Sequence, residues 1–397
     1  MRCFIVEDVV KDVSRETFPL LYECQSLKIT GCLLILVEEY NPSHLLEKED
    51  KMIRFNNDYN QTCLPEIMAA IQNLGDQTFP GYGQDDLCHA AVTLLREEIG
   101  WEDADIHFMP GATQANFIVH AAALRPIESV ICADSGHIAG HEAGSVENTG
   151  HQLLVVPCRD HSGKLHADDV RAMAEQYKAM GEPDYMTDPK LVYISQPTEY
   201  GGIYTLDELQ AIKEVCEDHD MMLFVDGARL AYALGSEDND VTLWDLAALC
   251  DAFTIGGTKC GALFGEAVVL TNDGLKRRFR TYMKQNGAVL AKGWLLGLQF
   301  YTLFQNGRYY KLGQKADQQA LRLKQAFKEV NLPLFTDSPS NQQFVLLTKA
   351  EQEKLAGTFI FEVFGPYNEH RDIVRFCTSW ATQDIEIDAL ISALRRL

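Results

Sequence analysis

The sequence predicts an α/β fold in which a mainly parallel central sheet is flanked by helices, with a smaller α+β domain at the C-terminus. First, short apolar runs alternate with amphipathic stretches from about residue 64, which indicates a parallel sheet covered on both faces. Second, the chain becomes strongly helical after Gly274, before short strands and a last helix follow from about Asn331. Third, the length of 397 residues exceeds what one hydrophobic core usually supports.

Seven short runs rich in β-branched and aromatic residues predict the strands of the central sheet. These runs are IHFMPGA (106–112), SVICAD (129–134), HQLLVVP (151–157), KLVYISQP (190–197), MMLFVD (221–226), DAFTIGG (251–257) and EAVVL (266–270). Between them, residues 113–124 and 205–219 have the pattern of helices, and Thr205 with Glu208 fits a capping box. Because ligands of such sheets bind beyond the carboxyl ends of the strands, the residues that follow each strand are the first candidates for a site.

The pattern divides the chain into three parts. Residues 52–300 hold the alternation of strands and helices and form the predicted large domain, and residues 301–397 form the predicted small domain. Residues 1–51 have no clear place in this alternation, and Met52 stands immediately before the first ordered pattern. We therefore expect an N-terminal extension, with an additional helix and strand packed on the main body as the alternative.

The composition limits the classes of partner. The 35 basic and 57 acidic residues give a formal charge of −22, which argues against nucleic acid or an anionic membrane as a main partner. Eleven cysteines without regular spacing indicate reduced thiols in a cytosolic protein. No segment approaches the roughly 20 apolar residues that span a bilayer, and acidic residues stand where a secretory signal carries positive charge. These features predict a cytoplasmic protein whose main partner is neither nucleic acid nor a membrane.

An aspartate and a lysine end two neighbouring strands of the predicted series. Asp226 ends a buried apolar run, and a buried carboxylate needs a cationic or strongly donating partner. Lys259 follows the next strand in a glycine-rich turn, which would let a cofactor approach the backbone. The pair fits pyridoxal phosphate, with Lys259 as the amine that binds it covalently and Asp226 holding its ring nitrogen protonated. The alternatives are a buried salt bridge between Asp226 and Arg229, and a lysine that extends from a loop to solvent.

The segment PGATQAN (110–116) lies between a predicted strand and a predicted helix, where free backbone N–H groups favour an anion. Gly111, Ala112 and Thr113 would provide amides and one hydroxyl for a phosphate group. Small residues at such a turn also occur for packing alone. The Walker-loop pattern, GxxxxGK followed by Ser or Thr, does not occur in the sequence.

Two histidines, His137 and His141, follow the predicted strand that ends at Asp134. Their i, i+4 spacing would suit a metal on a helix face, but Ile138 replaces the glutamate of the HExxH pattern and no third ligand is evident. His137 is better placed to stack on a cofactor ring or to move a proton, with a structural histidine as the alternative. We therefore expect no metal at this site.

With these motifs in this order, the sequence resembles the low-specificity L-threonine aldolases, in the aromatic amino acid β-eliminating lyase and threonine aldolase group. The segments that carry the resemblance are YGQDD, PGATQAN, ADSGHIAGHEAG, ISQPTEYGGIYTLDEL, VDGARL, GGTKCGALFGEAVV, KQNGAVLAKG and VRFCTSWAT. The likeness covers about residues 52–397 and does not extend to residues 1–51. It implies fold type I of the pyridoxal phosphate enzymes, within the aspartate aminotransferase-like superfamily.

The resemblance implies a role for each matching position. It makes Lys259 the lysine that binds the cofactor and Asp226 the partner of the pyridine nitrogen. It places Arg229 near the phenolic oxygen of the cofactor, and it makes His137 the histidine that stacks on the ring.

Further matches concern the phosphate and the substrate. Ala112 and Thr113 match the pair that binds phosphate, and Ala112 stands where many members have glycine. Arg375 matches the arginine that binds the substrate carboxylate, and its forked guanidinium suits that contact. A surface arginine on a strand is the alternative for this position. Asn56 and Tyr82 match positions that line the site.

The resemblance also implies a homotetramer with sites shared between subunits. Lys284 and the pair Arg277 and Arg278 match, more loosely, basic residues that reach the phosphate of a neighbouring subunit. Tyr82 matches a residue that can cross the same interface.

One segment departs from the common pattern of the group. Many members have a histidine in an ENTH segment, proposed to handle the substrate hydroxyl, whereas this chain has QPTE with Glu199 at that position. This variant belongs to a recognisable branch of the group. The group that takes the hydroxyl proton therefore stays open among Glu199, His137, His141 and a water molecule.

The resemblance implies cleavage of L-threonine, L-allo-threonine and other β-hydroxy amino acids between Cα and Cβ, to glycine and an aldehyde. The bond that lies perpendicular to the cofactor ring decides the reaction, so another pyridoxal phosphate-dependent β-eliminating lyase is the alternative. A non-catalytic descendant is a further alternative. It would have lost Lys259 or Asp226, and both are present.

Overall fold

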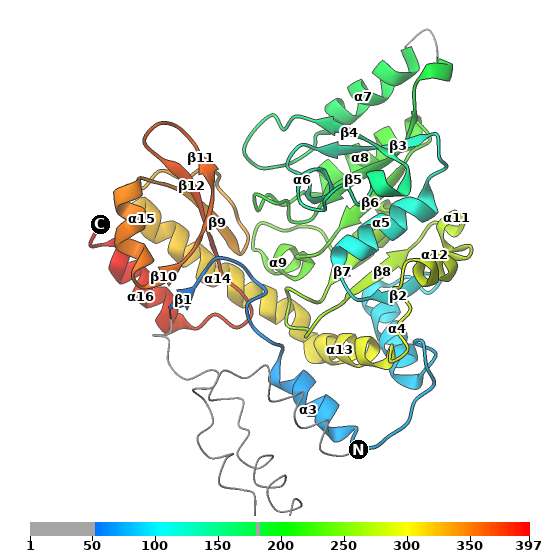
Figure 1. Ribbon diagram of the computed structural model, residues 1–397, viewed down its shortest axis with the longest axis horizontal. Helices are drawn as coiled ribbons and strands as arrows, with labels where there is room; N and C mark the ends of the chain where they lie inside the picture. The colour runs from blue at the N-terminus through cyan, green and yellow to red at the C-terminus, as the bar shows by residue number, and fades with distance from the viewer. Residues whose placement is uncertain (1–51, 180–182) are drawn as a thin grey trace, which may run out of the picture. The chain divides into compact units, whose positions relative to one another are not determined.

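The computed structural model describes residues 52–179 and 183–397 (Figure 1). Within this part of the chain, Ile53–Leu397 forms one compact unit. It contains a central sheet of seven strands, a sheet of three strands and a pair of two strands. The expected extension over residues 1–51 lies outside the described residues.

The central sheet has the strand order β2-β8-β7-β6-β5-β3-β4. Its strands are β2 (Asp105–Met109), β3 (Glu128–Ala133), β4 (Gln152–Val156), β5 (Asp188–Ser195), β6 (Met222–Asp226), β7 (Ala252–Gly256) and β8 (Glu266–Leu270). The pairs from β7 to β4 are parallel, whereas β8 is antiparallel to both of its neighbours. The prediction of a mainly parallel sheet is confirmed, and each predicted run overlaps one strand. β8 runs antiparallel to β7 because the connection between them, residues 257–265, is too short for the crossover that parallel strands need.

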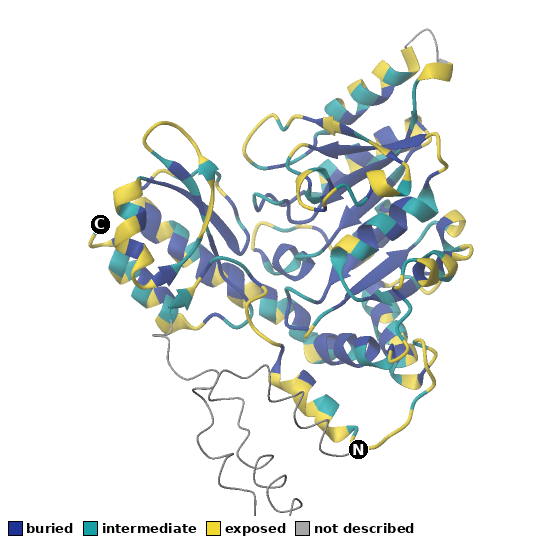
Figure 2. Cartoon of the chain, viewed as in Figure 1, coloured by how far each residue is buried: buried dark blue, intermediate teal, exposed yellow. Residues whose placement is uncertain are grey.

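Helices cover both faces of this sheet. They are α3 (Pro65–Asn73), α4 (Asp86–Ile99), α5 (Ala112–Ala123), α6 (His137–Gly140), α7 (Ala167–Ala179), α8 (Leu206–Asp218), α9 (Leu230–Gly235), α10 (Leu243–Leu249), α11 (Asp273–Lys276), α12 (Phe279–Gln285) and α13 (Trp294–Phe304), with short 3-10 turns η3 (Glu147–Thr149) and η4 (Pro183–Tyr185). Alternate residues of a strand point to opposite faces. On β5, Val192 and Ile194 join a core cluster with α4 and α8, whereas Leu191 and Tyr193 join one with α5 and α12. Figure 2 shows the resulting buried layer in dark blue between the helices.

Local signals in the sequence set the helix ends. The predicted capping box of α8 is present, because Thr205 accepts from the N–H of Glu208 and the Glu208 carboxylate accepts from the N–H of Thr205. α4 begins where the Asp85 carboxylate accepts from the N–H of Cys88, and it ends at Gly100 in the left-handed conformation. None of the described helices has the length and apolar character needed to cross a membrane.

The C-terminal part packs around a core of its own. Its elements are η5 (Gln305–Gly307), α14 (Arg308–Glu329), β9 (Gln342–Leu347), α15 (Lys349–Ala356), β10 (Phe359–Ile360), β11 (Glu362–Pro366), β12 (Asp372–Cys377) and α16 (Asp384–Leu394). β11, β12 and β9 form an antiparallel sheet in that order, so the smaller α+β part is confirmed. β1 (Ile53–Arg54) pairs in parallel with β10, and Phe55 lies in the same core. The division into 52–300 and 301–397 stays a prediction.

Candidate active site

Residues that follow several strands of the central sheet meet at its carboxyl edge. Asp226 ends β6, Lys259 lies in the turn after β7, and His137 lies at the start of α6, after β3. They line one pocket, whose lining residues are Ala112, His137, Ser195, Pro197, Glu199, Asp226, Ala228, Arg229 and Lys259. The pocket therefore lies where a parallel sheet covered on both faces places its ligand sites.

Asp226 is buried and has no ion pair among the described residues. Its Oδ2 accepts from the Tyr193 hydroxyl at 2.7 Å and from the Asn116 amide at 2.8 Å, and its Oδ1 accepts from the N–H of Ala228 at 2.8 Å. Burial raises the pKa of Asp226, but these hydrogen bonds outweigh burial, and the net pKa lies below its ordinary value. The carboxylate is thus ready to hold a protonated ring nitrogen. The alternative of a salt bridge with Arg229 is wrong, because Arg229 pairs with a different acid.

That acid is Asp58, which the sequence analysis did not single out. Arg229 donates from Nε to Asp58 Oδ2 at 2.7 Å and from Nη2 to Oδ1 at 3.2 Å, and Asn341 adds a hydrogen bond at 3.0 Å. Burial alone would raise the pKa of Asp58. The charges of Arg229 and Lys259 lower it by more than this, so the net pKa is about 2, below the ordinary value of 3.8. The partners are 171 residues apart, so no local pattern indicates the pair.

Lys259 is half-buried in the turn between β7 and β8. Burial lowers the pKa of Lys259, and the nearby Arg229 guanidinium lowers it further. The Tyr232 hydroxyl donates to the main-chain oxygen of Lys259 at 2.6 Å and fixes the turn. Glu266, a second acid that the sequence analysis missed, is buried on β8, and burial raises its pKa to about 8. An amine with a lowered pKa is a better nucleophile at neutral pH, so Lys259 suits covalent attachment of a carbonyl compound.

The glycines of this turn pack against protein, so the expectation that they let a cofactor approach the backbone is wrong. A Cβ on Gly256 would lie 2.3 Å from the oxygen of Ala228, and one on Gly257 would lie 2.6 Å from the oxygen of Gly265. Gly265 also has a φ of 121°, which residues with side chains rarely adopt. The glycines let two main-chain turns pack closely, and this packing holds Lys259 at the edge of the sheet.

His137 begins α6 and lines the pocket. Its Nδ1 lies 2.7 Å from Oε1 of Glu142, a further acid that the sequence analysis did not single out. The His141 ring lies 5.7 Å from the His137 ring, and burial lowers the pKa of His141. Within residues 52–179 and 183–397, no group of three His, Cys, Asp or Glu side chains is arranged to hold a metal ion.

Glu199 lies in the loop after β5, where its Oε1 accepts from the Ser195 hydroxyl at 2.7 Å and from the N–H of His137 at 2.9 Å. Burial raises the pKa of Glu199, and the hydrogen bond from Ser195 offsets only part of that rise. A carboxyl group with a raised pKa can exchange a proton closer to neutral pH. Glu199 and His137 therefore form one connected polar group at the pocket.

The start of α5 faces the same pocket through Ala112, its first residue. Gly111 is the N-cap and brings no side-chain hydrogen bond, and Thr113 is exposed. The first N–H groups of the helix therefore stay free for an anion.

Arg375 lies on β12, and its guanidinium contacts Asn56, near the first described residue. It donates from Nη1 to the Gln342 side chain at 3.0 Å and from Nη2 to the main-chain oxygen of Asn56 at 2.8 Å. The Arg375 guanidinium also lies 4.9 Å from the ring of Phe364. Its Nε is buried without a hydrogen-bond partner in the described part of the chain. The guanidinium is thus oriented by neutral groups and keeps its full charge for a carboxylate.

Arg375, Asn56 and several other predicted site residues are not among the residues that line this pocket. Tyr82 is exposed, and the Lys284 ammonium lies 4.5 Å from the centre of its ring. Arg280 donates to the main-chain oxygen of Tyr82 at 2.9 Å, and Tyr82 lines a different cavity, of about 270 Å³. Arg277 and Arg278 are exposed between α11 and α12. The chain alone does not bring these residues to Lys259.

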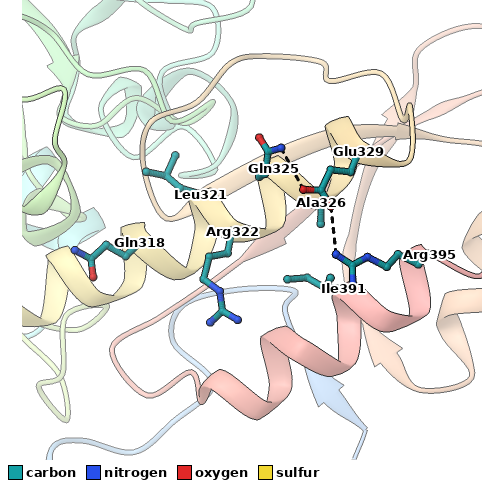
Figure 3. Close-up of a pocket in the computed structure, with 8 residues that line it drawn as sticks. All are labelled: Gln318, Leu321, Arg322, Gln325, Ala326, Glu329, Ile391 and Arg395. Carbon is teal, nitrogen blue, oxygen red and sulfur yellow. Dashed lines mark hydrogen bonds and ion pairs between the residues drawn. The ribbon is translucent and has the colours of Figure 1, made fainter.

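A separate cavity of about 410 Å³ lies between α14 and α16 (Figure 3). Leu321 and Ile391 contribute its apolar surface, and Glu329 forms an ion pair with Arg395 at 3.3 Å across the two helices. None of the predicted site residues lines this cavity.

The residues of the pocket fit pyridoxal phosphate. Asp226 offers an ionised acid without a cationic partner, and Lys259 offers an amine with a lowered pKa. Both line the same pocket as the free amides at the start of α5. The three groups match the ring nitrogen, the aldehyde and the phosphate of this cofactor.

Known proteins similar to this chain point to one family. Residues 63–350 match the model of the β-eliminating lyase family. The low specificity L-threonine aldolase of Pseudomonas sp. (strain NCIMB 10558) is 26% identical over 352 residues, which cover 87% of this chain and 98% of that protein. The enzyme of the same name from Pseudomonas aeruginosa is 28% identical over 339 residues, which cover 83% of this chain and 93% of that protein.

Solved structures agree with this assignment. A threonine aldolase of Leishmania major matches with a TM-score of 0.84 and 41% identity, covering 87% of this chain and 99% of that chain. The aminotransferase YbdL of Escherichia coli matches with a TM-score of 0.68 and 14% identity, covering 97% of this chain and 100% of that chain, and shows the fold alone. The chain therefore belongs to the β-eliminating lyase family of pyridoxal phosphate enzymes and, within it, is similar to the threonine aldolases.

Proposed function

We propose that this chain is a pyridoxal phosphate-dependent aldolase that cleaves L-threonine, L-allo-threonine and other β-hydroxy amino acids to glycine and an aldehyde. The observation that carries the proposal is that Asp226 and Lys259 lie in one pocket at the ends of adjacent strands. The activity named for the similar proteins supports the reaction type.

Each polar group of the pocket has a task in binding the cofactor. Pyridoxal phosphate, when bound, supplies an electron-poor ring that accepts the electron pair of a broken Cα–Cβ bond. Lys259 would bind its aldehyde carbon, and Asp226 would keep the ring nitrogen protonated. The free N–H groups at the start of α5 would bind the phosphate. Arg229, held by Asp58, would lie near the phenolic oxygen, and His137 would stack on the ring.

Arg375 binds the carboxylate of the amino acid substrate, and Asn56 supports it. The hydrogen bonds from Arg375 to Gln342 and to Asn56 fix the plane of the guanidinium, so the position of the substrate carboxylate is fixed as well. A carboxylate held in this way would help to orient the Cα–Cβ bond perpendicular to the ring of bound pyridoxal phosphate, and that orientation would favour cleavage of this bond over the others.

Of the three candidate side chains for taking the proton of the substrate hydroxyl, Glu199 and His137 line the pocket and His141 does not. Glu199 and His137 are joined through the main-chain N–H of His137. The hydrogen bond between His137 Nδ1 and Glu142 favours the His137 ring as the acceptor.

Lys259→Ala tests the proposal, because it removes the amine that binds the cofactor. Purified wild-type protein should show the visible absorption of lysine-bound pyridoxal phosphate and release acetaldehyde and glycine from both threonine diastereomers. The variant should lose this absorption and about 1,000-fold or more in rate. Lys311→Ala, which removes an exposed lysine of α14 outside the pocket, is the matched control and should keep both.

Two other outcomes would change the assignment. Cofactor absorption without any aldehyde would retain the cofactor and contradict the aldolase. Ammonia and pyruvate from another amino acid would favour the alternative of β-elimination, which the name of the matched family raises.

We further propose a homotetramer in the cytoplasm. The position of Tyr82 and Lys284 outside the pocket of their own chain supports shared sites, because a neighbouring subunit would then receive them. All eight cysteines among the described residues are free thiols, which suits a reducing compartment.

A further inference from the structure

Glu142 is a buried acid beside the pocket that the proposed function does not yet use. It follows α6, and its side chain has no exposed surface. Its Oε1 lies 2.7 Å from His137 Nδ1 and 2.7 Å from Asn116 Nδ2, and its Oε2 accepts from the Ser145 hydroxyl at 2.7 Å. A carboxylate with three partners and no contact with solvent has one orientation, so it can orient the groups that touch it.

Asn116 shows that Glu142 acts as an acceptor. Its Nδ2 donates to Oε1 of Glu142 and, at 2.8 Å, to Oδ2 of Asp226, which uses both hydrogens of the amide. Its own oxygen is buried without a hydrogen-bond partner in the part of the chain that the structure describes. The opposite amide orientation would place this oxygen against two acids. The two acids therefore both accept from Asn116.

The main chain next to Glu142 adopts an unfavourable conformation. Ala143 has a φ of 52°, in the left-handed region, and Gly144 follows with a φ of 70°. An alanine rarely adopts this conformation, and it persists only where surrounding contacts hold it. The turn brings Glu142 back to the His137 ring at the end of a short helix.

The contact with Glu142 determines the tautomer of His137. An ionised carboxylate has no proton to donate, so the proton between the two groups lies on Nδ1. The other nitrogen, Nε2, has no hydrogen-bond partner among the described residues, and the side chain lines the pocket. A neutral ring of this tautomer has its lone pair on Nε2. In contrast, Oε1 of Glu199 already accepts two hydrogen bonds.

We propose that Glu142 is a positioning residue that keeps the His137 proton on Nδ1, so that His137 Nε2 takes the proton of the substrate hydroxyl. This inference rests on the proposed aldolase function and names its base. The O–H bond breaks, its proton goes to Nε2, and its electron pair forms the aldehyde C=O bond. The bound cofactor would accept the Cα–Cβ electron pair, and the carboxylate of Glu142 would stabilise the imidazolium that results.

Glu142 is the acid in direct contact with a ring nitrogen of His137. The charged and titratable groups around that ring, from the pocket and the elements packed against it, are Glu142, Glu199, Asp226, His141, Arg229 and Lys259. Glu199 touches the main chain of His137, and the His141 ring stands 5.7 Å away. Removal of the charge of Glu142 should therefore change proton transfer at His137 more than removal of another nearby acid.

The test compares Glu142→Gln with Glu147→Gln, a matched control that removes one charge from an exposed side chain of η3. Glutamine keeps the size of Glu142 and removes its charge. We expect Glu142→Gln to bind pyridoxal phosphate and L-threonine within about threefold of wild type, while kcat falls about 10- to 100-fold. Glu147→Gln should change neither.

A second readout does not depend on activity. Spectra of 15N-labelled histidine, with the His137 signals assigned among eleven histidines through His137→Asn, should show the neutral ring protonated on Nδ1. Glu142→Asp keeps the charge but shortens the side chain, so the Nε2-protonated form should increase, and this variant carries the test if Glu142→Gln does not fold.

Three results decide between the proposals. A wild-type ring protonated on Nε2, or an unchanged kcat in Glu142→Gln, would overturn the role of Glu142. A ring protonated on Nδ1 in a protein that releases no aldehyde would instead overturn the proposed function and leave the positioning of the ring intact.

Discussion

Asp58 and Asp226 are both buried carboxylates, and the protein stabilises their charges by different means. Asp58 forms an ion pair with Arg229, whereas Asp226 accepts hydrogen bonds from the neutral side chains of Tyr193 and Asn116. A buried ion pair neutralises itself, but an acid held by neutral donors keeps its negative charge available. The first arrangement therefore fixes structure, and the second provides a site for a cation.

Asp58→Asn should destabilise the fold. The substitution leaves the Arg229 guanidinium buried without a counter-ion, and the loss of one partner of such a pair costs about 3 kcal/mol. We expect a lower midpoint of urea unfolding for the cofactor-free variant at neutral pH. Asp220→Asn is the matched control, because the carboxylate of Asp220 pairs with Lys190 but is exposed to solvent. Its loss should leave the midpoint nearly unchanged.

The same ion pair predicts how the difference in free energy of unfolding between wild type and Asp58→Asn depends on pH. The pKa of Asp58 is about 2 in the folded protein, against an ordinary value of 3.8. A group with a lowered pKa stabilises the fold above its unfolded pKa and loses this contribution as the pH falls through the folded one. The stability difference should therefore reach its maximum above about pH 4 and decrease as the pH falls toward about 2. A difference that stays constant over this range would contradict the charge-based explanation.

At the residue scale, the sequence predicts side chains that follow strands and misses those whose partners are distant. Asp226 and Lys259 could be found because each comes directly after an apolar run. Asp58 reaches Arg229 across 171 residues, and Asn116 reaches Asp226 across 110 residues. Such pairs depend on which strands and loops become neighbours in the fold, and no period in the sequence encodes that.

At the scale of elements, the sequence is sufficient wherever the deciding interaction is local. The capping box of α8 joins residues three positions apart, and the helix spans Leu206–Asp218 where 205–219 was predicted. The direction of β8 depends on the short connection before it, and the closely packed glycines before β8 depend on partners in another turn, at Ala228. The length of the connection can be read from the sequence, whereas the glycine packing is a tertiary contact, which the strand patterns do not reveal.

α14 contains a buried acid whose pKa is raised by burial more than the nearby main chain of Asn341 lowers it. Asp317 is buried, and neither of its carboxyl oxygens has a hydrogen-bond partner within the described residues. Burial raises the pKa of Asp317 well above its ordinary range, so the folded protein keeps this group protonated. The helix contributes to the core of the C-terminal part and packs against α9 of the large part.

Asp317→Asn should stabilise the protein increasingly as the pH rises. Wild type loses stability with rising pH between the unfolded and folded pKa values of Asp317, because the unfolded chain releases a proton that the folded one retains. Asparagine has a similar shape and no proton to lose. From pH 5 to pH 8, the advantage of the variant in free energy of unfolding should grow by about 1 kcal/mol or more. Urea unfolding of both proteins at the two pH values measures this advantage. The same difference in free energy of unfolding at both pH values would contradict a protonated Asp317.

At the scale of the whole molecule, the pocket depends on segments from both ends of the described chain. Arg375 binds the main-chain oxygen of Asn56 across 319 residues, and Asp58 holds Arg229 of the large part. Phe55, which precedes these residues, lies in the core of the C-terminal part. The first described residues therefore contact both the C-terminal core and Arg229 of the pocket, and the orientation of Arg375, the proposed substrate-binding arginine, depends on their correct folding.

Mixed oligomers test whether neighbouring subunits complete each other's sites. If Lys284 acts in the site of a partner, the Lys259→Ala substitution damages the site of its own chain. The Lys284→Ala substitution instead damages the site of the neighbouring chain. A mixed dimer then contains one site with a native Lys259 from one chain and a native Lys284 from the other. Random assembly of equal amounts makes about half of the dimers mixed, so about one quarter of all sites regain wild-type composition.

The matched control replaces Lys284→Ala with His137→Asn, because His137 lines the same pocket as Lys259 within one chain. Mixing Lys259→Ala with His137→Asn restores no site, since every pocket keeps one of the two lesions. Subunits are exchanged by co-expression with different tags, and acetaldehyde release is measured on the doubly tagged fraction. Recovery with Lys284→Ala and none with His137→Asn would place Lys284 in the neighbouring site. Equal recovery in both mixtures would mean that the variants only stabilise each other's fold, and no recovery in either would confine Lys284 to its own chain.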